Sequence, residues 1–284
     1  MATGYHVRSI SLPSRSHPST TKVEEELNKL RTWEASSTSG SICIDLAGIA
    51  DLCSSLDDLL NLTSTREVIS RHRHEKCLNE LLDQYVRLLD ICSIARDVTS
   101  QFKEQIRALQ SAFRRRKRDS CIKSNSDSYT CFRKKMNKEA KKLIASLKHI
   151  NNKLGVSALS EQHKHFSTTI QMLREANMAN TSVLESVLLS LSAPVLKSKQ
   201  TRWSLVSKLL HKGVISSAEK QGSLDELESL HATLSKGFGF EKMKFMLEKL
   251  EALEMQMEAI GNGLEGAFRS LIKTRTSMLN VFSQ

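Results

Sequence analysis

Residues 78–113, LNELLDQYVRLLDICSIARDVTSQFKEQIRALQSAF, decide the fold. Apolar or small residues recur in this stretch at alternating steps of three and four, which is the spacing of a heptad seam on one face of a helix. The seam consists of Leu78, Leu81, Tyr85, Leu88, Cys92, Ala95, Thr99, Phe102, Ile106, Leu109 and Phe113. Because neither proline nor glycine occurs between residues 66 and 118, we expect one uninterrupted helix over this range.

A second seam occupies the C-terminal segment. Its members are Met243, Met246, Leu250, Leu253, Met257, Ile260, Leu264, Ala267 and Leu271, continued more weakly by Thr274, Met278 and Val281. Two long helices with matching seams need partners for their apolar faces. We predict pairing within one chain, in an antiparallel bundle, and keep self-association through a coiled coil as the alternative. Since Cys92, Ala95 and Thr99 specify a dimer poorly, we expect mostly monomer, with a homodimer as the second option.

The rest of the chain is equally favourable to helices. Between Pro18 and Pro194 it has no proline and only three glycines. Further helices are expected at 21–35, 42–62, 129–154 and 160–191, with a polar connection near 119–128 and a looser region near 193–222. We therefore predict an all-α fold, an elongated bundle of long antiparallel helices with coiled-coil-like heptad seams. Residues 1–20 are expected to form a disordered basic Ser/Pro tail, and 21–284 a single helical-bundle domain.

Composition limits the class of protein. The 284 residues are 39% hydrophobic, enough for a core, but only 5% aromatic, which favours helix-on-helix packing. The net charge of +11 favours acidic partners, although a merely soluble basic protein has the same excess. Six scattered cysteines without a Cys-x-x-Cys pair suggest small core residues in a reducing compartment. No apolar run of spanning length and no signal peptide is evident, so we expect neither an integral membrane nor a secreted protein, but a cytoplasmic or nuclear one.

The motifs that suggest chemistry do not withstand closer reading. Residues 261–266, GNGLEG, match the dinucleotide-binding pattern, but a helical seam precedes them where that fingerprint requires a strand, so a kink or a close helix crossing is the better interpretation. The two histidines of each His-x-His pair, at 72–74 and 163–165, point to different sides of a helix and cannot bind one metal ion together. Glu228 and His231 have the Glu-x-x-His spacing of di-iron bundles, but the sequence has no second copy of this motif. We predict no enzyme, no metal and no cofactor.

The strongest chemical feature is a run of cations. It comprises Arg114, Arg115, Arg116, Lys117 and Arg118, followed after the polar connection by Arg133, Lys134 and Lys135, with Lys138, Lys141 and Lys142 beyond. Such a cluster suits an importin, a nucleic acid or anionic lipid head groups. Favourable placement of cations at a helix C-terminus accounts for one or two of them, not for five.

The N-terminal tail carries one short motif. Arg8, Ser11 and Pro13 fit the Arg-Ser-x-Ser-x-Pro pattern that 14-3-3 proteins read when the second serine is phosphorylated, so Ser11 is a candidate phosphosite and a 14-3-3 protein a candidate partner. The same serine- and arginine-rich, acid-poor composition also fits an organelle transit peptide, and this alternative stays open.

Several ordered pieces of the sequence resemble one family. They are YHVRSISLPSR at 5–15, Trp33-Glu34, LLDIC at 88–92 with Arg96-Asp97, LQSAFRRR at 109–116, WSLVS at 203–207 and the end at 247–282. Together they resemble the plant BYPASS-related family over nearly the whole chain. The resemblance implies an all-helical plant protein associated with root and shoot development, and no catalytic residues to carry over. We therefore predict a non-enzymatic interaction or regulatory protein that acts through protein–protein contacts; the alternative is a nuclear or membrane-surface protein that binds polyanions through residues 114–118.

Overall fold

The computed structural model describes residues 17–35, 42–115, 119–154, 164–192 and 240–283. These residues form seven helices and no strand, so the all-helical prediction is confirmed for the described part of the chain. The helices are α1 (Pro18–Ala35), α2 (Ile42–Leu60), α3 (Thr63–Arg71), α4 (Lys76–Arg114), α5 (Asp119–Leu154), α6 (Lys164–Ser192) and α9 (Phe240–Phe282).

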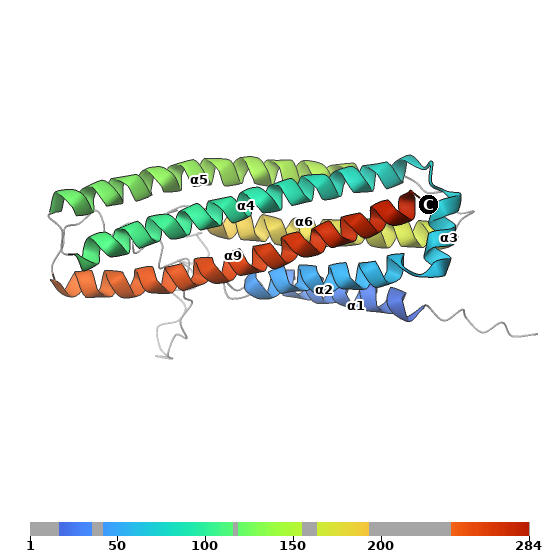
Figure 1. Cartoon of the computed structure of the whole chain (residues 1–284), viewed down its shortest axis with the longest axis horizontal. Helices are drawn as coiled ribbons and strands as arrows, with labels where there is room; N and C mark the ends of the chain where they lie inside the picture. The colour runs from blue at the N-terminus through green and yellow to red at the C-terminus, as the bar shows by residue number, and fades with distance from the viewer. Residues whose placement is uncertain (1–16, 36–41, 116–118, 155–163, 193–239, 284) are drawn as a thin grey trace, which may run out of the picture.

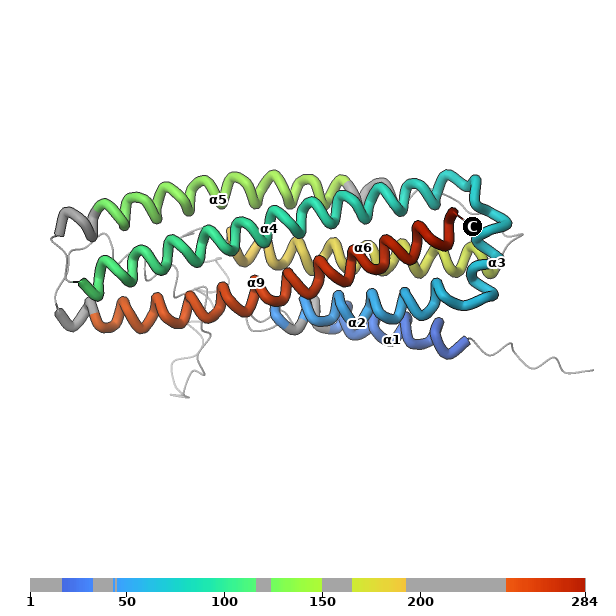
Figure 2. Tube along the Cα trace, in the orientation of Figure 1, coloured from blue at the N-terminus to red at the C-terminus, as the bar shows by residue number. Residues whose placement is uncertain are grey.

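The long helices lie lengthwise beside one another (Figure 1). The trace in Figure 2 shows α4 running away from α3 and α9 returning toward it, so these two neighbours point in opposite directions. Helices α1 and α2 cover only the half of the molecule nearer α3, where α2 packs against α9 and runs in the same direction as α9. Helix α3 crosses this end and buries Thr65 and Ile69.

Both predicted seams are buried wherever the structure describes their side chains, which leaves out Met243. Every seam residue of α4 from Leu78 to Phe113 is less than a tenth exposed, as are the α9 seam residues from Met246 to Val281. The Cys92 thiol lies 3.6 Å from the carbonyl oxygen of Leu264, which brings the centres of the two seams together. The core is therefore one hydrophobic cluster, mostly of aliphatic side chains with a few aromatic ones, between the helices.

The single helix predicted over 66–118 is wrong, because the chain leaves the helical conformation at residues 72–75. His72 closes α3, its backbone N–H donating to the Ile69 carbonyl, and its ring stacks on Phe166 of α6 at 4.2 Å between centroids. No seam residue falls in the polar stretch before Cys77, so a continued helix would gain no burial there. The break instead lets α3 turn across the end of the bundle and bury its own apolar side.

Two further boundaries differ from prediction. Residues 119–128, expected to be a polar connection, are the first turns of α5. They contain no proline or glycine, and Ser124, Asp127 and Ser128 are exposed, so polarity here marks a solvated helix face. Residues 18–20, assigned to the tail, open α1: proline is well tolerated at a first helical position, and His17 Nδ1 accepts a hydrogen bond from the backbone N–H of Ser19 at 3.2 Å. The predicted looser region near 193–222 lies outside the described residues.

Candidate functional site

The predicted basic cluster begins at the end of α4. Arg114 and Arg115 are exposed there, while Arg116, Lys117 and Arg118 lie outside the described residues. The Arg114 guanidinium donates to Glu251 of α9 at 2.7 Å. An open groove of about 390 Å³ lies at this point, mostly along α4 and bordered by α9. Its lining consists of Arg107, Gln110, Ser111, Arg114, Arg115 and Glu254.

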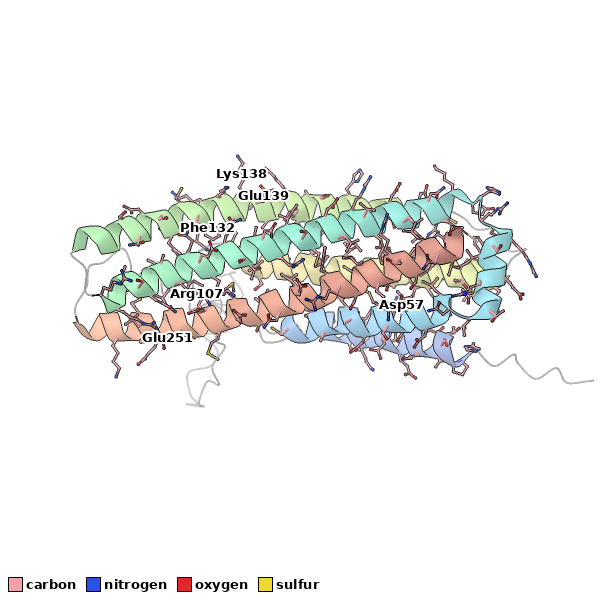
Figure 3. All side chains as sticks on the ribbon, in the orientation of Figure 1. Asp57, Arg107, Phe132, Lys138, Glu139 and Glu251 are labelled. Atoms are coloured by element: carbon pink, nitrogen blue, oxygen red, sulfur yellow. The ribbon has the colours of Figure 1, made fainter. Side chains whose placement is uncertain are left out.

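Carboxylates of α9 already neutralise most of the cations in this groove. Glu254 accepts hydrogen bonds from Arg107 Nε at 2.6 Å and from Gln110 Nε2 at 2.9 Å. These two contacts, Arg107 first, hold the pKa of the Glu254 carboxyl below its usual range. Figure 3 labels Arg107 on α4 and Glu251 on α9 at this end of the bundle. The groove is therefore nearly balanced in charge, which weakens its case as an anion site.

The same pairing continues along the two helices. Each pair joins a cation of α4 to a glutamate of α9, and the members are Arg96 with Glu265, Lys103 with Glu258, Arg107 with Glu254 and Arg114 with Glu251. Exposed pairs of this kind contribute little stability singly, about 0 to 1 kcal/mol each. Because all four cations are on α4 and all four carboxylates on α9, the pairs together favour this antiparallel register of α4 on α9 over registers in which one helix is shifted along the other.

We expect the contribution of Glu254 to depend on pH. Its folded pKa is depressed, so the ion pair stabilises the fold above the ordinary carboxyl value of 4.5 and is lost as the pH falls through the folded pKa. A Glu254→Gln variant should therefore lose about 1 kcal/mol or less at pH 7 and converge on the wild type in acid. Urea unfolding between pH 7 and pH 3 measures the difference. Glu248→Gln, at an exposed carboxylate without an ion pair in the described ranges, should show no such trend.

Arg133 does not belong to the basic surface. It is 7% exposed, and its guanidinium donates to the Leu191 carbonyl at 2.8 Å and lies over the Phe102 ring at 5.1 Å. Leu191 is in the last turn of α6, where carbonyls lack partners within their own helix. Burial lowers the pKa of the guanidinium, and Tyr129 opposes this. Arg133 thus caps α6 from α5, and its burial argues against the predicted place of this residue in an anion patch.

The lysines that follow Arg133 are exposed on the outer side of α5. Lys134, Lys135, Lys138 and Lys141 have no ion pair with any described residue, and we call these four the lysine face. Lys142 pairs with Glu139 at 3.2 Å, and Lys148 with Glu185 at 3.4 Å. Lys138 points away from the bundle in Figure 3, whereas Phe132 points toward α4, where it packs on Phe102. The buried side of α5, with Tyr129, Met136 and Ala140, is opposite.

Periodicity could have separated Arg133 from the lysine face. Arg133 stands four residues after Tyr129 and three before Met136, on the apolar stripe of α5, while Lys134, Lys138 and Lys141 share the opposite stripe. A count of consecutive cations hides this division because neighbouring residues in a helix point about 100° apart. The structure thus divides the predicted patch into an ion-paired helix end, one internal cap and the exposed lysine face.

The remaining motifs stay structural within the described residues. Cys53, Cys77 and Cys92 are buried as predicted, and burial raises the pKa of the Cys53 and Cys92 thiols to about 12, which keeps them protonated. Cys43 and Cys131 are exposed, contrary to the expectation of core cysteines. Gly261, Gly263 and Gly266 lie inside α9. No group of three His, Cys, Asp or Glu side chains in the described ranges could hold a metal ion.

Two further predictions concern the N-terminal phosphosite and a membrane crossing. Ser11, with Arg8 and Pro13, lies outside the described residues, so the phosphosite stays a prediction. No helix of the described part combines the length and apolarity that a membrane crossing requires.

Comparison with known proteins identifies one family. A family model described as Protein BPS1 matches residues 45–281. Neither the curated proteins nor the solved structures yielded a match.

Proposed function

The chain belongs to the BPS1 family, a BYPASS-related family of plant proteins, and from this premise we propose that it is a non-enzymatic developmental regulator that binds acidic protein partners through the lysine face. In this proposal the bundle is an elongated monomeric scaffold of antiparallel helices whose heptad seams close within one chain. Root and shoot development are the processes in which we place it, as the family resemblance implies.

The lysine face is the observation that carries this proposal. Lys134 to Lys141 span about two turns of α5, or roughly 10 Å at 1.5 Å per residue, and all four ammonium groups stand on the solvent side. Four cations that form no ion pair with a described residue raise the local potential and attract an acidic surface. The groove at the end of α4 differs in this respect, because Glu254 and Glu251 form ion pairs with two of its three arginines, Arg107 and Arg114.

A charge-neutral variant tests the proposal. We expect Lys134, Lys135, Lys138 and Lys141 all changed to Gln to abolish capture of acidic partners from plant cell extract, while the free energy of unfolding stays within about 0.5 kcal/mol of wild type because the sites are exposed. The control changes Lys22, Arg71, Lys76 and Arg269 to Gln, which removes the same charge from exposed sites on four other helices. Quantitative mass spectrometry of the captured proteins is the measurement. Equal recovery of the same partners by all three proteins would contradict the proposal.

A nuclear or membrane-surface polyanion is the second candidate, because a row of unpaired lysines also suits phosphates. Binding to DNA or to anionic vesicles should then weaken steeply with salt, and loss of the four lysines should reduce the slope of log K against log salt by roughly 3 to 4 for DNA. Binding of the wild type and of the lysine-face variant with equal slopes would remove this candidate.

A further inference from the structure

Helix α4 carries a row of carboxylates on the side opposite its buried seam. The members follow one another at intervals of seven residues, and we call them the acidic row: Asp83, Asp90, Asp97 and Glu104. All four are exposed, and none forms an ion pair with a described residue. An interval of seven returns to nearly the same side of a helix, so the row is one continuous stripe. Val86 and Ile94, each 37% exposed, lie on the same side of α4.

The acidic row and the lysine face lie at the same level of the bundle. Helix α5 runs beside α4 in the opposite direction (Figure 1). The Ser128 hydroxyl lies 3.3 Å from Gln105 Oε1, and this contact shows how the two helices are aligned. Counting equal steps along both helices from this contact places the lysine face level with residues 92–99 of α4. The lysines therefore stand at the level of Asp90 and Asp97, on the neighbouring helix.

The two sets of charges also match in spacing. Lys134 and Lys141 are seven residues apart, as are Asp90 and Asp97, which is about 10 Å along either helix. A half rotation about the long axis of the bundle sets α4 of a second copy against α5 of the first, and α5 of the second against α4 of the first. This rotation keeps the levels, so Asp97 meets Lys134 and Asp90 meets Lys141 to within about 3 Å along the axis.

We propose that two copies of this chain associate reversibly through this side, the acidic row of each against the lysine face of the other. Rows of opposite charge attract each other and select one orientation, as the α4 cations and α9 glutamates do within the chain. The association is weak, because exposed ion pairs contribute little each and both copies carry a net charge of +11. The heptad seams take no part in it and stay closed within each chain.

Self-association and partner binding use the same lysines. One consequence rests on the proposed function: an acidic partner and a second copy exclude each other from the lysine face. The monomer is then the form that binds a partner, and the weak dimer is a reserve in which the lysine face is covered.

Charge reversal tests the contact. Asp90→Lys with Asp97→Lys makes both facing sides basic, whereas Lys134→Glu with Lys141→Glu makes both acidic. Each double variant alone should associate at least about tenfold more weakly than the wild type, because attraction becomes repulsion at four contacts. An equimolar mixture of the two double variants should restore association, since each copy then meets the opposite charge at every contact. A chain with all four changes should associate with itself for the same reason.

The control and the measurement complete this experiment. Glu24→Lys with Glu248→Lys changes the net charge as much as the reversal of the acidic row does, at exposed sites on α1 and α9, and should associate like the wild type. Sedimentation velocity of the full chain over a range of protein concentrations, at low and high salt, measures association. We expect a wild-type dimer at high concentration that high salt dissociates. A wild type that is monomeric throughout, or a mixture that does not restore association, would overturn the proposal.

Partner capture separates this inference from the proposed function. Asp90→Lys with Asp97→Lys leaves the lysine face intact, so this variant should capture acidic partners at least as well as the wild type. Self-association that follows the charge reversals, without capture of any acidic partner, would contradict the proposed function alone. Capture by a chain that never associates would contradict this inference alone.

Discussion

Gly263→Leu is expected to lower the free energy of unfolding by about 3 kcal/mol, because overpacking at a close helix crossing forces backbone or side-chain shifts. A Cβ atom at residue 263 would stand 2.9 Å from Leu46 Cδ1 and 3.1 Å from Leu46 Cβ. Leu46 is 1% exposed in the core between α2 and α9 and has little room to retreat. The remaining carbons of leucine would enlarge the clash.

The neighbouring Gly266 provides the control. A Cβ atom there meets nothing within 4 Å, and the position is exposed in the same helix. Gly266→Leu should stabilise the protein by about 0.5–1 kcal/mol through helix propensity alone. Urea unfolding of both variants measures the difference. Equal effects at the two positions would mean that α2 does not cross α9 at Gly263.

Arg133→Ala is the second change with a large expected effect, a loss of about 3 kcal/mol, since it removes a charge-assisted hydrogen bond and leaves a buried carbonyl unpaired. The substitution also takes the guanidinium from the face of Phe102, 5.1 Å away, and opens space next to Tyr129. The Leu191 carbonyl, near the end of α6, would then lose the donor that lies 2.8 Å from it.

Lys134→Ala and Lys135→Ala are the controls for this variant, because each removes one positive charge from a residue next to Arg133 on α5. Both side chains are exposed, so each substitution should change stability by at most about 0.5 kcal/mol. Thermal unfolding of the three single variants, with partner capture as a second readout, separates the roles: Arg133 should act on stability, the lysines on capture. A stable Arg133→Ala protein that fails to capture partners would return Arg133 to the binding surface.

The helices were largely predictable, and their ends were not. The seams of α4 and α9 can be read from the three-and-four spacing of apolar residues within each helix. The sequence of a helix alone determines which of its sides is apolar. No proline or glycine marks the break at residues 72–75. It depends on what α3 gains by crossing the bundle and on the stacking of His72 on Phe166, which is 94 positions away.

The sequence showed which residues of the candidate site are cations, but not where each of them lies in the fold. The run of cations was visible, but its division among a groove, an internal cap and the lysine face depends on contacts such as that of Arg133 with Leu191, 58 residues apart. Arg107 and Arg114 likewise have carboxylate partners 147 and 137 residues away. No local pattern shows which cations have such partners.

The amino-acid sequence by itself determined that this chain is helical, which faces of its long helices are apolar and that it carries an excess of positive charge, since these follow from periodicity and composition. Only the tertiary structure decided where Gly263 lets α2 approach α9, which arginines are neutralised by α9, that Arg133 points inward and that the lysine face forms no ion pair with a described residue. The physical reason is that burial and charge pairing depend on residues that become neighbours only when the helices pack.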